Sequence, residues 1–475
     1  MTRHGERSGA QGRRLSSFIT SLQWDDVPDD VRHKTSLAAV DDLAAMVSGA
    51  PARSSRIAAE YAAAVFSAGT TTLVADARRT AAEGGAFANA VAANAYDIDD
   101  VGVHVWGHAG AQVFPAALAL AEAAGASGRD LLTAMLVGYE IAALTGIGMY
   151  ADVPVSPDRD YRGCGAWGAV ACAAVAARLL GLGESETCHA LGIAEYHAPH
   201  VELLRDVRHP AMVKHGHGPA ALTGVMSARL AACGFTGIPS LLELERLADR
   251  VNDLGVSYLI MGRGLEWKRY ACCWWVHPAL DAVAAITATT PFTADEVSRI
   301  AVEAHHDSRL LGARSSVTTE EAQFNMAWPI AALTVDGDVS PAQVAEDRMT
   351  DEGIRDLAAR VELLESAELD RLFWLAETGC RQGREGARVL IELKDGRVLD
   401  SGIVSLARGD ESSWTTERMR DKFHWATRRV LTQPASEEIC GLAESLPALD
   451  DVRVLTAALR RHLFEPPRAR PERSD

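Results

Sequence analysis

The sequence predicts a mainly α-helical protein with a large all-helical domain formed by both chain ends and a smaller α+β domain. The chain has 475 residues, more than one ordinary core accommodates, so two domains are expected. From about residue 37 to 264 it is rich in alanine and leucine at helical spacing. Residues 265–410 add alternating and β-branched runs, and the helical pattern then returns. We therefore assign residues 1–264 and 411–475 to the helical domain and residues 265–410 to the α+β domain.

The helical domain consists of apolar segments joined by short connections that contain glycine. Glycine at a helix end, followed by a new cap, is typical of such connections. Pro115 suits the first turn of the helix after His108, where a backbone N–H has no partner within the helix. The expected helices cover residues 86–95, 115–124, 130–145, 169–180 and 219–232.

The smaller domain combines strands with helices. Residues 299–305 and 387–399 contain alternating or β-branched runs, and Asp395-Gly396 is a strong hairpin signal between two such runs. Helical patterns occupy residues 322–335 and 351–365. The last segment, residues 415–463, is helical and is expected to return to the large domain.

Composition argues against several classes of function. A hydrophobic content of 48% with 23% charged residues is typical of a soluble globular protein. A net charge of −17 argues against nucleic acid as a partner, because phosphate binding needs a basic face. The longest apolar run, residues 166–177, is too short to span a bilayer, and the N-terminal segment lacks the apolar core of a secretory signal. The 8 cysteines have no framework spacing, which favours free thiols in the cytoplasm.

Three polar clusters stand out from the apolar background. Lys214 and His217 precede an apolar helical pattern, and their spacing predicts side chains on one helical face. A cation beside an imidazole at a helix N-terminus suits an anionic substrate that gains or loses a proton. The other clusters are residues 97–110 and 267–273, and together the three point to an enzyme. Motifs for dinucleotide, nucleotide, serine-hydrolase and zinc-protease sites are absent from the sequence.

Several short motifs also follow one another in a fixed order. They are residues 95–100 (Ala-Tyr-Asp-Ile-Asp-Asp), 108–110 (His-Ala-Gly), 115–122, 138–140, 178–182, Lys214-x-x-His217, 234–237, 268–273 and 335–337. This order resembles the MmgE/PrpD family of 2-methylcitrate dehydratases and cis-aconitate decarboxylases over about residues 37–430. The resemblance implies a lid-like smaller domain, a cofactor-free active site between the domains and a homodimer. It also implies a small carboxylate substrate that loses or gains a proton next to a carboxyl group.

The resemblance carries individual residues over to this chain. Asp97 matches the first aspartate of the family's acidic motif, and His108 matches the histidine after it, with one extra residue between them. Lys214, His217 and Lys268 match the lysine, the histidine and the second lysine of the family site.

Four positions depart from the decarboxylase pattern. Val101 stands where a threonine is expected, and Arg162 where a histidine is expected. Cys273 stands in place of another histidine, and Trp328 in place of a tyrosine. These changes argue against cis-aconitate decarboxylation and weaken 2-methylcitrate dehydration, but they leave the anion-binding core in place.

Each acidic or imidazole candidate has a chemical role and a structural alternative. We expect His108 to shuttle a proton near neutral pH, in a segment whose backbone N–H groups can receive a carboxylate. Asp97 is expected to orient His108 with help from Asp100, and helix capping is the alternative. No complete ligand set accompanies the aspartates, so neither a metal nor a cofactor is expected.

The remaining candidates concern substrate binding. Lys214 and Lys268 are expected to clamp carboxylates, with Arg162 as a third cation, and a solvated surface charge is the alternative for each. Cys273 either exchanges a proton or packs as a buried thiol. Trp328 is expected to shape the pocket.

Three reactions fit these residues. In a hydro-lyase, His108 takes or delivers the proton while the lysines stabilise enolate-like charge. The alternative is an epimerase of a dicarboxylate such as iminodisuccinate, in which His108 and Cys273 exchange the α proton from opposite faces. Decarboxylation ranks third. A protein that binds a carboxylate without turning it over is the non-enzymatic alternative.

Overall fold

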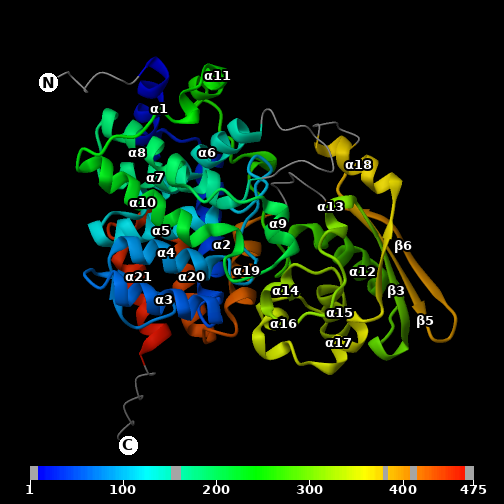
Figure 1. Ribbon diagram of the computed structural model, residues 1–475. Coiled ribbons are helices and arrows are strands. Elements are labelled where there is room, and N and C mark those ends of the chain that lie inside the picture. The colour runs from blue at the N-terminus through cyan, green and yellow to red at the C-terminus, as the bar shows by residue number, and fades with distance from the viewer. Residues whose placement is uncertain (1–8, 151–161, 378–382, 407–413, 466–475) are drawn as a thin grey trace, which may run out of the picture.

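The computed structural model describes residues 9–150, 162–377, 383–406 and 414–465. Figure 1 shows a body of packed helices beside a smaller lobe that contains a four-stranded sheet. The predicted fold class, mainly α with a smaller α+β part, is confirmed.

The body is centred on α5, α7 and α10, which pack against one another. Small residues permit this close approach: a Cβ added at Gly224 of α10 would lie 2.4 Å from the Cβ of Cys172 in α7. Helix α6 is long and apolar enough to cross a membrane, but 94% of its apolar window is buried inside the protein, as in a core helix. The helices of this part are α1 Ala10–Ser21, α2 Asp29–Ser48, α3 Arg53–Val65, α4 Ala82–Ala93, α5 Gly110–Ala124, α6 Gly128–Tyr150, α7 Cys164–Leu179, α8 Glu184–His197, α9 Leu203–Arg208, α10 His217–Ala232 and α11 Ala248–Asn252, with the short strands β1 Thr71–Thr72 and β2 Arg79–Thr80.

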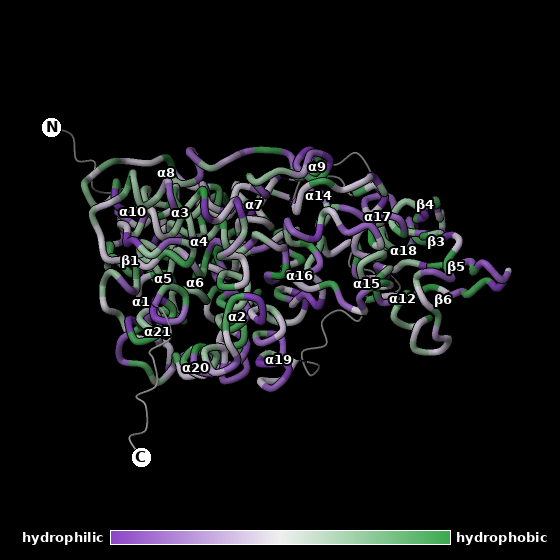
Figure 2. The backbone as a smooth tube through the Cα atoms, turned by 90° about the horizontal axis from the view of Figure 1, so that it is seen from below, coloured by the Kyte–Doolittle hydropathy of each residue, from purple (hydrophilic) through white to green (hydrophobic). Residues whose placement is uncertain are grey.

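The smaller lobe holds a sheet of order β4-β3-β5-β6, against which α12 packs. Strands β3 and β4 are parallel, whereas β3–β5 and β5–β6 are antiparallel. The hairpin predicted at Asp395-Gly396 is confirmed, with Gly396 at a φ of 91°. Its hydrophilic tip projects from the lobe in Figure 2. The elements are α12 His277–Thr289, β3 Val297–Ala304, α13 His306–Arg309, α14 Thr319–Gln323, α15 Ala327–Asp336, α16 Pro341–Val344, α17 Glu352–Ala358, β4 Val361–Glu365, α18 Ala367–Glu377, β5 Gly386–Leu393 and β6 Val398–Ser405.

The chain then returns to the body. Helices α19 Thr416–Thr427, α20 Gln433–Glu444 and α21 Arg453–Phe464 follow the sheet, and α19 and α20 pack on α2 near the start of the chain. In Figure 1 these orange and red helices lie among the blue ones. The two ends of the chain therefore share one helical body.

Three local predictions were wrong. Helix α5 begins at Gly110, so Pro115 lies inside the helix rather than in its first turn. Residues 361–365 form strand β4, because Val361 to Glu365 pair with β3 along their length and this pairing outweighs a weak helical pattern. The helix expected over residues 322–335 is broken between Gln323 and Ala327, where the Asn325 side chain accepts hydrogen bonds from two backbone N–H groups and caps α15.

Candidate active site

A pocket opens where the helical body meets the smaller lobe, and several helices begin at its wall. His108 precedes α5, and Cys164 is the first residue of α7. His215 precedes α10, and Cys273 precedes the turn that leads into α12. Part of the pocket is open to solvent. A helix N-terminus carries a positive dipole end, so this convergence favours an anionic ligand, although the Gly110 N–H of α5 already donates to Oδ1 of Asp100.

His108 is buried in the wall of this pocket with a defined tautomer. Its Nδ1 lies 2.6 Å from the carbonyl oxygen of Asp100, and a carbonyl can only accept, so Nδ1 carries the proton. Burial, reinforced by the charge of Lys268, lowers the pKa of His108 to about 3. The imidazole is therefore neutral at physiological pH, and its Nε2 is available as a proton acceptor.

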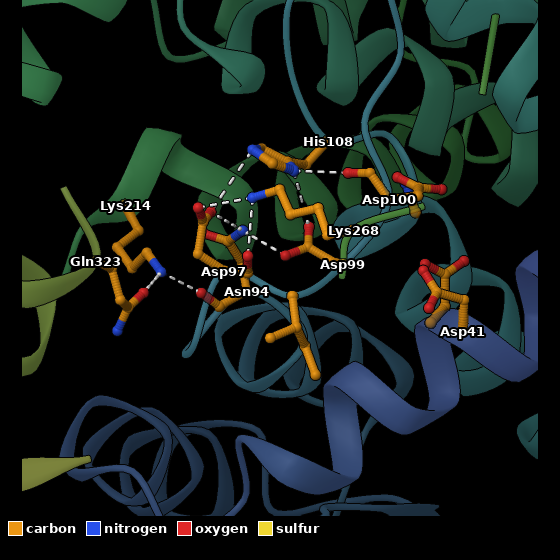
Figure 3. A network of polar contacts seen from close by, with 12 residues as sticks. Asp41, Asn94, Asp97, Asp99, Asp100, His108, Lys214, Lys268 and Gln323 are labelled. Carbon is orange, nitrogen blue, oxygen red and sulfur yellow. Dashed lines mark hydrogen bonds and ion pairs between the residues drawn. The ribbon is translucent and has the colours of Figure 1, made fainter. Parts of the chain in front are cut away.

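Asp97 and Lys268 form a fully buried ion pair beside this imidazole (Figure 3). The Lys268 ammonium donates to Oδ2 of Asp97 at 2.7 Å, to its carbonyl oxygen at 2.8 Å and to the carbonyl oxygen of Cys272 at 3.2 Å. Burial alone would raise the pKa of Asp97, but Lys268, His108 and Lys214 hold it below its ordinary value. Oδ1 of the ionised Asp97 lies 3.6 Å from Nε2 of His108. A positive charge formed on the imidazole of His108 would therefore lie next to the negative charge of Asp97.

More carboxyl groups lie behind the histidine. Asp99 Oδ2 is 3.4 Å from Nδ1 of His108, and burial raises the pKa of Asp99 to about 6. The Tyr139 hydroxyl lies within hydrogen-bonding distance of both Asp100 and Asp42. It has one proton to donate, so both contacts can be hydrogen bonds only if one of these carboxyl groups is itself protonated. Burial accordingly raises the pKa of Asp100 to about 7 and that of Asp42 well above its ordinary value.

The residues just before α10 are not helical, contrary to the prediction that Lys214 and His217 lie on one helix. Lys214, His215 and Gly216 all have positive φ angles, of 28°, 57° and 78°, and α10 begins only at His217. The expectation that Lys214 and His217 share one helical face is therefore wrong, because Lys214 and the two residues after it are left-handed and turn the chain before α10 begins. The Lys214 ammonium donates to the carbonyl oxygen of Asn94 and, at 2.5 Å, to Oε1 of Gln323 (Figure 3).

The same turn places two further imidazoles against His108. The ring of His215 stacks on that of His108 with centroids 6.0 Å apart, and Nδ1 of His215 lies 2.7 Å from Oδ2 of Asp206. His217 meets the His108 ring edge-on, also at 6.0 Å. Both ring nitrogens of His217 are buried without a hydrogen-bond partner among the described residues. His215 lines the pocket, whereas His217 lies behind it.

His215 and Asp206 were not predicted as site residues. His215 lies between Lys214 and His217, and a second histidine in the Lys-His-Gly-His run was the available signal. Asp206 belongs to the six-residue helix α9 and carries no motif, so only the fold reveals its proximity.

The remaining predicted residues occupy different environments. Cys273 lines the pocket, and burial raises the pKa of its thiol to about 12. Trp328 is buried in the core of the smaller lobe and donates from its indole to the carbonyl oxygen of Gln343. Arg162 is exposed, and its backbone pairs with that of Glu202. Among the described residues that line the pocket, the predicted site residues are therefore His108 and Cys273.

One trio of side chains has the spacing of a metal site. A carboxylate oxygen of Asp97 and ring nitrogens of His108 and His215 all lie within 4.8 Å of one another. The donor set suits a divalent transition metal, but the ammonium of Lys268 already occupies the same carboxylate and opposes a second cation. The prediction that the protein uses neither a metal nor a cofactor stays a prediction.

Comparison with known proteins identifies the family. The MmgE/PrpD N-terminal domain matches residues 13–252, and the MmgE/PrpD C-terminal domain matches residues 270–446. This chain belongs to the MmgE/PrpD family. The two matches together cover nearly all of the described chain and leave residues 253–269 between them.

Curated relatives of this MmgE/PrpD protein are distant but extend over most of its length. The cis-aconitate decarboxylase-like protein oryM of Aspergillus oryzae is 25% identical over 94% of this chain and 97% of its own. Human cis-aconitate decarboxylase is 24% identical over 79% of each chain, and the mouse enzyme is 25% identical over 79% of this chain and 78% of its own. The chain is thus a member of an enzyme family of the dehydratase and decarboxylase type.

Proposed function

We propose that this protein is a lyase that eliminates water from a small hydroxy-carboxylate, with His108 as the base. The observation that carries the proposal is the neutral, buried imidazole of His108 at a pocket where helix N-termini converge. A carboxylate binds at the helix N-termini, and its charge raises the proton affinity of the nearby imidazole. Nε2 of His108 then removes the proton from the carbon next to the carboxylate.

The charges around His108 support this step. When His108 takes up the proton, its imidazolium lies 3.6 Å from the Asp97 carboxylate and 3.4 Å from the Asp99 carboxyl group. These negative groups stabilise the positive charge that forms on the ring. Lys268 and Lys214 keep Asp97 ionised in the resting state. A direct contact between either lysine and a substrate carboxylate stays a prediction, because both ammonium groups bind protein oxygens in this structure.

The leaving hydroxide needs a proton from a second group. The C–H electron pair forms the new C=C bond, the C–O bond breaks, and the departing oxygen takes a proton to leave as water. His215, paired with Asp206, lines the pocket beside His108 and is the group that we assign to this transfer. The Cys273 thiol remains protonated at neutral pH because its pKa is raised, so it suits a proton donor better than the thiolate base of an epimerase.

Decarboxylation is the second candidate, and the relatives favour it. The three curated relatives described above are named as cis-aconitate decarboxylases or as similar to them. Against it stand Arg162, Cys273 and Trp328, which replace the histidines and tyrosine of the decarboxylase pattern.

Homodimer formation and a cytoplasmic location also stay predictions.

Proton NMR in deuterated water distinguishes these reactions. The protein is incubated with citrate, 2-methylcitrate, cis-aconitate and other di- and tricarboxylates. An alkene signal from a hydroxy acid supports the proposal, since elimination creates a C=C bond. Release of carbon dioxide, or inversion at the α carbon without elimination, overturns it in favour of decarboxylation or epimerisation. Tight binding of these acids with no turnover of any favours a carboxylate-binding protein.

A further inference from the structure

We infer that the substrate is a carboxylate with an apolar substituent of several carbons or an aromatic ring, and that the aromatic side of the pocket holds this substituent. The inference rests on the proposed function, because it takes the pocket at His108 as the substrate site.

Aromatic and aliphatic side chains form most of the pocket wall. They come from the loop before α5, from α9, from the segment before α12 and from the end of α14, so residues far apart in sequence build one apolar surface. Several are partly exposed to the pocket although they are large and apolar, which is typical of a ligand surface. The apolar wall consists of Val101, Val103, Trp106, Leu203, Val207, Trp274, Trp275 and Phe324.

The charges of the wall do not match a compact tricarboxylate. Apart from the histidines, Glu266 is the one ionisable side chain of formal charge among the described lining residues, and it is negative. Lys214 and Lys268 lie behind the wall and are hydrogen-bonded to protein oxygens. Three carboxylates in this space would face indole and aliphatic carbon, which cannot replace their lost water. An amphipathic acid instead places its carboxylates at the helix N-termini and its apolar part among the tryptophans.

The loop that carries Trp106 is held in a fixed shape. Val101 and Glu266 exchange two backbone hydrogen bonds of 2.8 Å, and the Gly102 N–H donates to the carbonyl oxygen of Gly107 at 2.9 Å. Trp106 itself has a φ of 51°, an unusual value for a bulky residue. A strained backbone conformation persists only where the surrounding structure holds it in place, and such conformations cluster at ligand sites. The loop therefore presents the indole of Trp106 to the pocket as a rigid surface.

Calorimetric titration with succinate, butylsuccinate, hexylsuccinate and benzylsuccinate tests the inference. These probes carry the same two carboxylates and differ in their apolar part. Affinity is expected to rise about two- to fourfold per added methylene, because each buried methylene gains hydrophobic free energy. Trp275→Ala should weaken hexylsuccinate at least tenfold and leave succinate nearly unchanged. The control Phe235→Ala, which changes an exposed ring beyond the far end of α10, should alter neither.

The outcomes separate this inference from the proposed function. Equal or falling affinity along the succinate series overturns the inference, while α-proton exchange of the bound acids still tests the lyase. Binding of 1-hexanol as tightly as hexylsuccinate means that the pocket does not recognise a carboxylate, and both ideas then fail. If Trp275→Ala does not fold, the wild-type series alone decides.

Discussion

Replacement of Lys268 by methionine should destabilise the protein in a pH-dependent way. Lysine and methionine have similar volumes, so the variant leaves little cavity and chiefly removes a charge. Lys268 is fully buried, and its ammonium donates to three oxygens, one of them on the equally buried Asp97 carboxylate. Removal of one partner of a buried ion pair typically costs about 3–5 kcal/mol. That is a large part of the roughly 5–15 kcal/mol by which a domain is stable.

The pH dependence follows from Asp97. In the folded wild type the pKa of Asp97 is held below its value in the unfolded chain. The ionised Asp97 therefore stabilises the fold above about pH 4, and this stabilisation is lost as the pH falls below that value. In Lys268→Met the main cation is gone and burial raises the Asp97 pKa. The folded state then prefers a protonated Asp97, so the cost of the substitution grows as the pH rises.

Urea denaturation of the wild type, Lys268→Met and the double variant Asp97→Asn/Lys268→Met at pH 5 and pH 8 measures this effect. The single variant should lose more stability at pH 8 than at pH 5. The double variant should recover about 1–3 kcal/mol of the loss at pH 8, because no unpaired charge remains. A single variant within about 1 kcal/mol of the wild type at pH 8 would show that the buried pair does not carry this energy.

Three further predictions follow from the site. Asp100→Asn should gain stability relative to the wild type as the pH rises from about 4 to about 7, because the raised pKa of Asp100 makes its ionisation costly in the folded state. Urea titrations in which the stability difference between variant and wild type does not change with pH would contradict this prediction. Asp206→Asn should lower kcat roughly 10- to 100-fold and shift the pH profile with little change in KM, because His215 loses its partner; an unaltered profile would remove His215 from proton transfer. Cys273→Ser should reduce kcat less than about tenfold, whereas a loss beyond about a hundredfold would favour the epimerase.

Much of the fold could be predicted from the sequence because it depends on local patterns. Helices α4, α5, α6, α7 and α10 overlap the predicted segments, since their apolar residues recur at helical spacing. The β5–β6 hairpin was predicted from Asp395-Gly396, whose turn requires a left-handed glycine. Strand β4 was not, because its identity depends on pairing with the distant β3.

The site was only partly predictable. Asp97, His108 and Lys268, which the family resemblance singled out, lie close together, but Lys268 pairs with Asp97, a contact that the sequence did not predict. Lys214 instead points at Asn94 and Gln323, because consecutive left-handed residues redirect the chain in a way that spacing does not reveal. His215 enters the site through the same turn. Such backbone conformations arise from tertiary contacts, so a sequence pattern carries little trace of them.

The decisive measurement is deuterium incorporation at the α carbon of a bound hydroxy-carboxylate in deuterated water, for the wild type and for His108→Asn. His33→Asn, which changes an exposed histidine on α2, serves as the control. The wild type and the control should incorporate deuterium, and His108→Asn should slow incorporation by about a hundredfold or more while remaining folded. Incorporation by His108→Asn at the wild-type rate would contradict the assignment of His108 as the base.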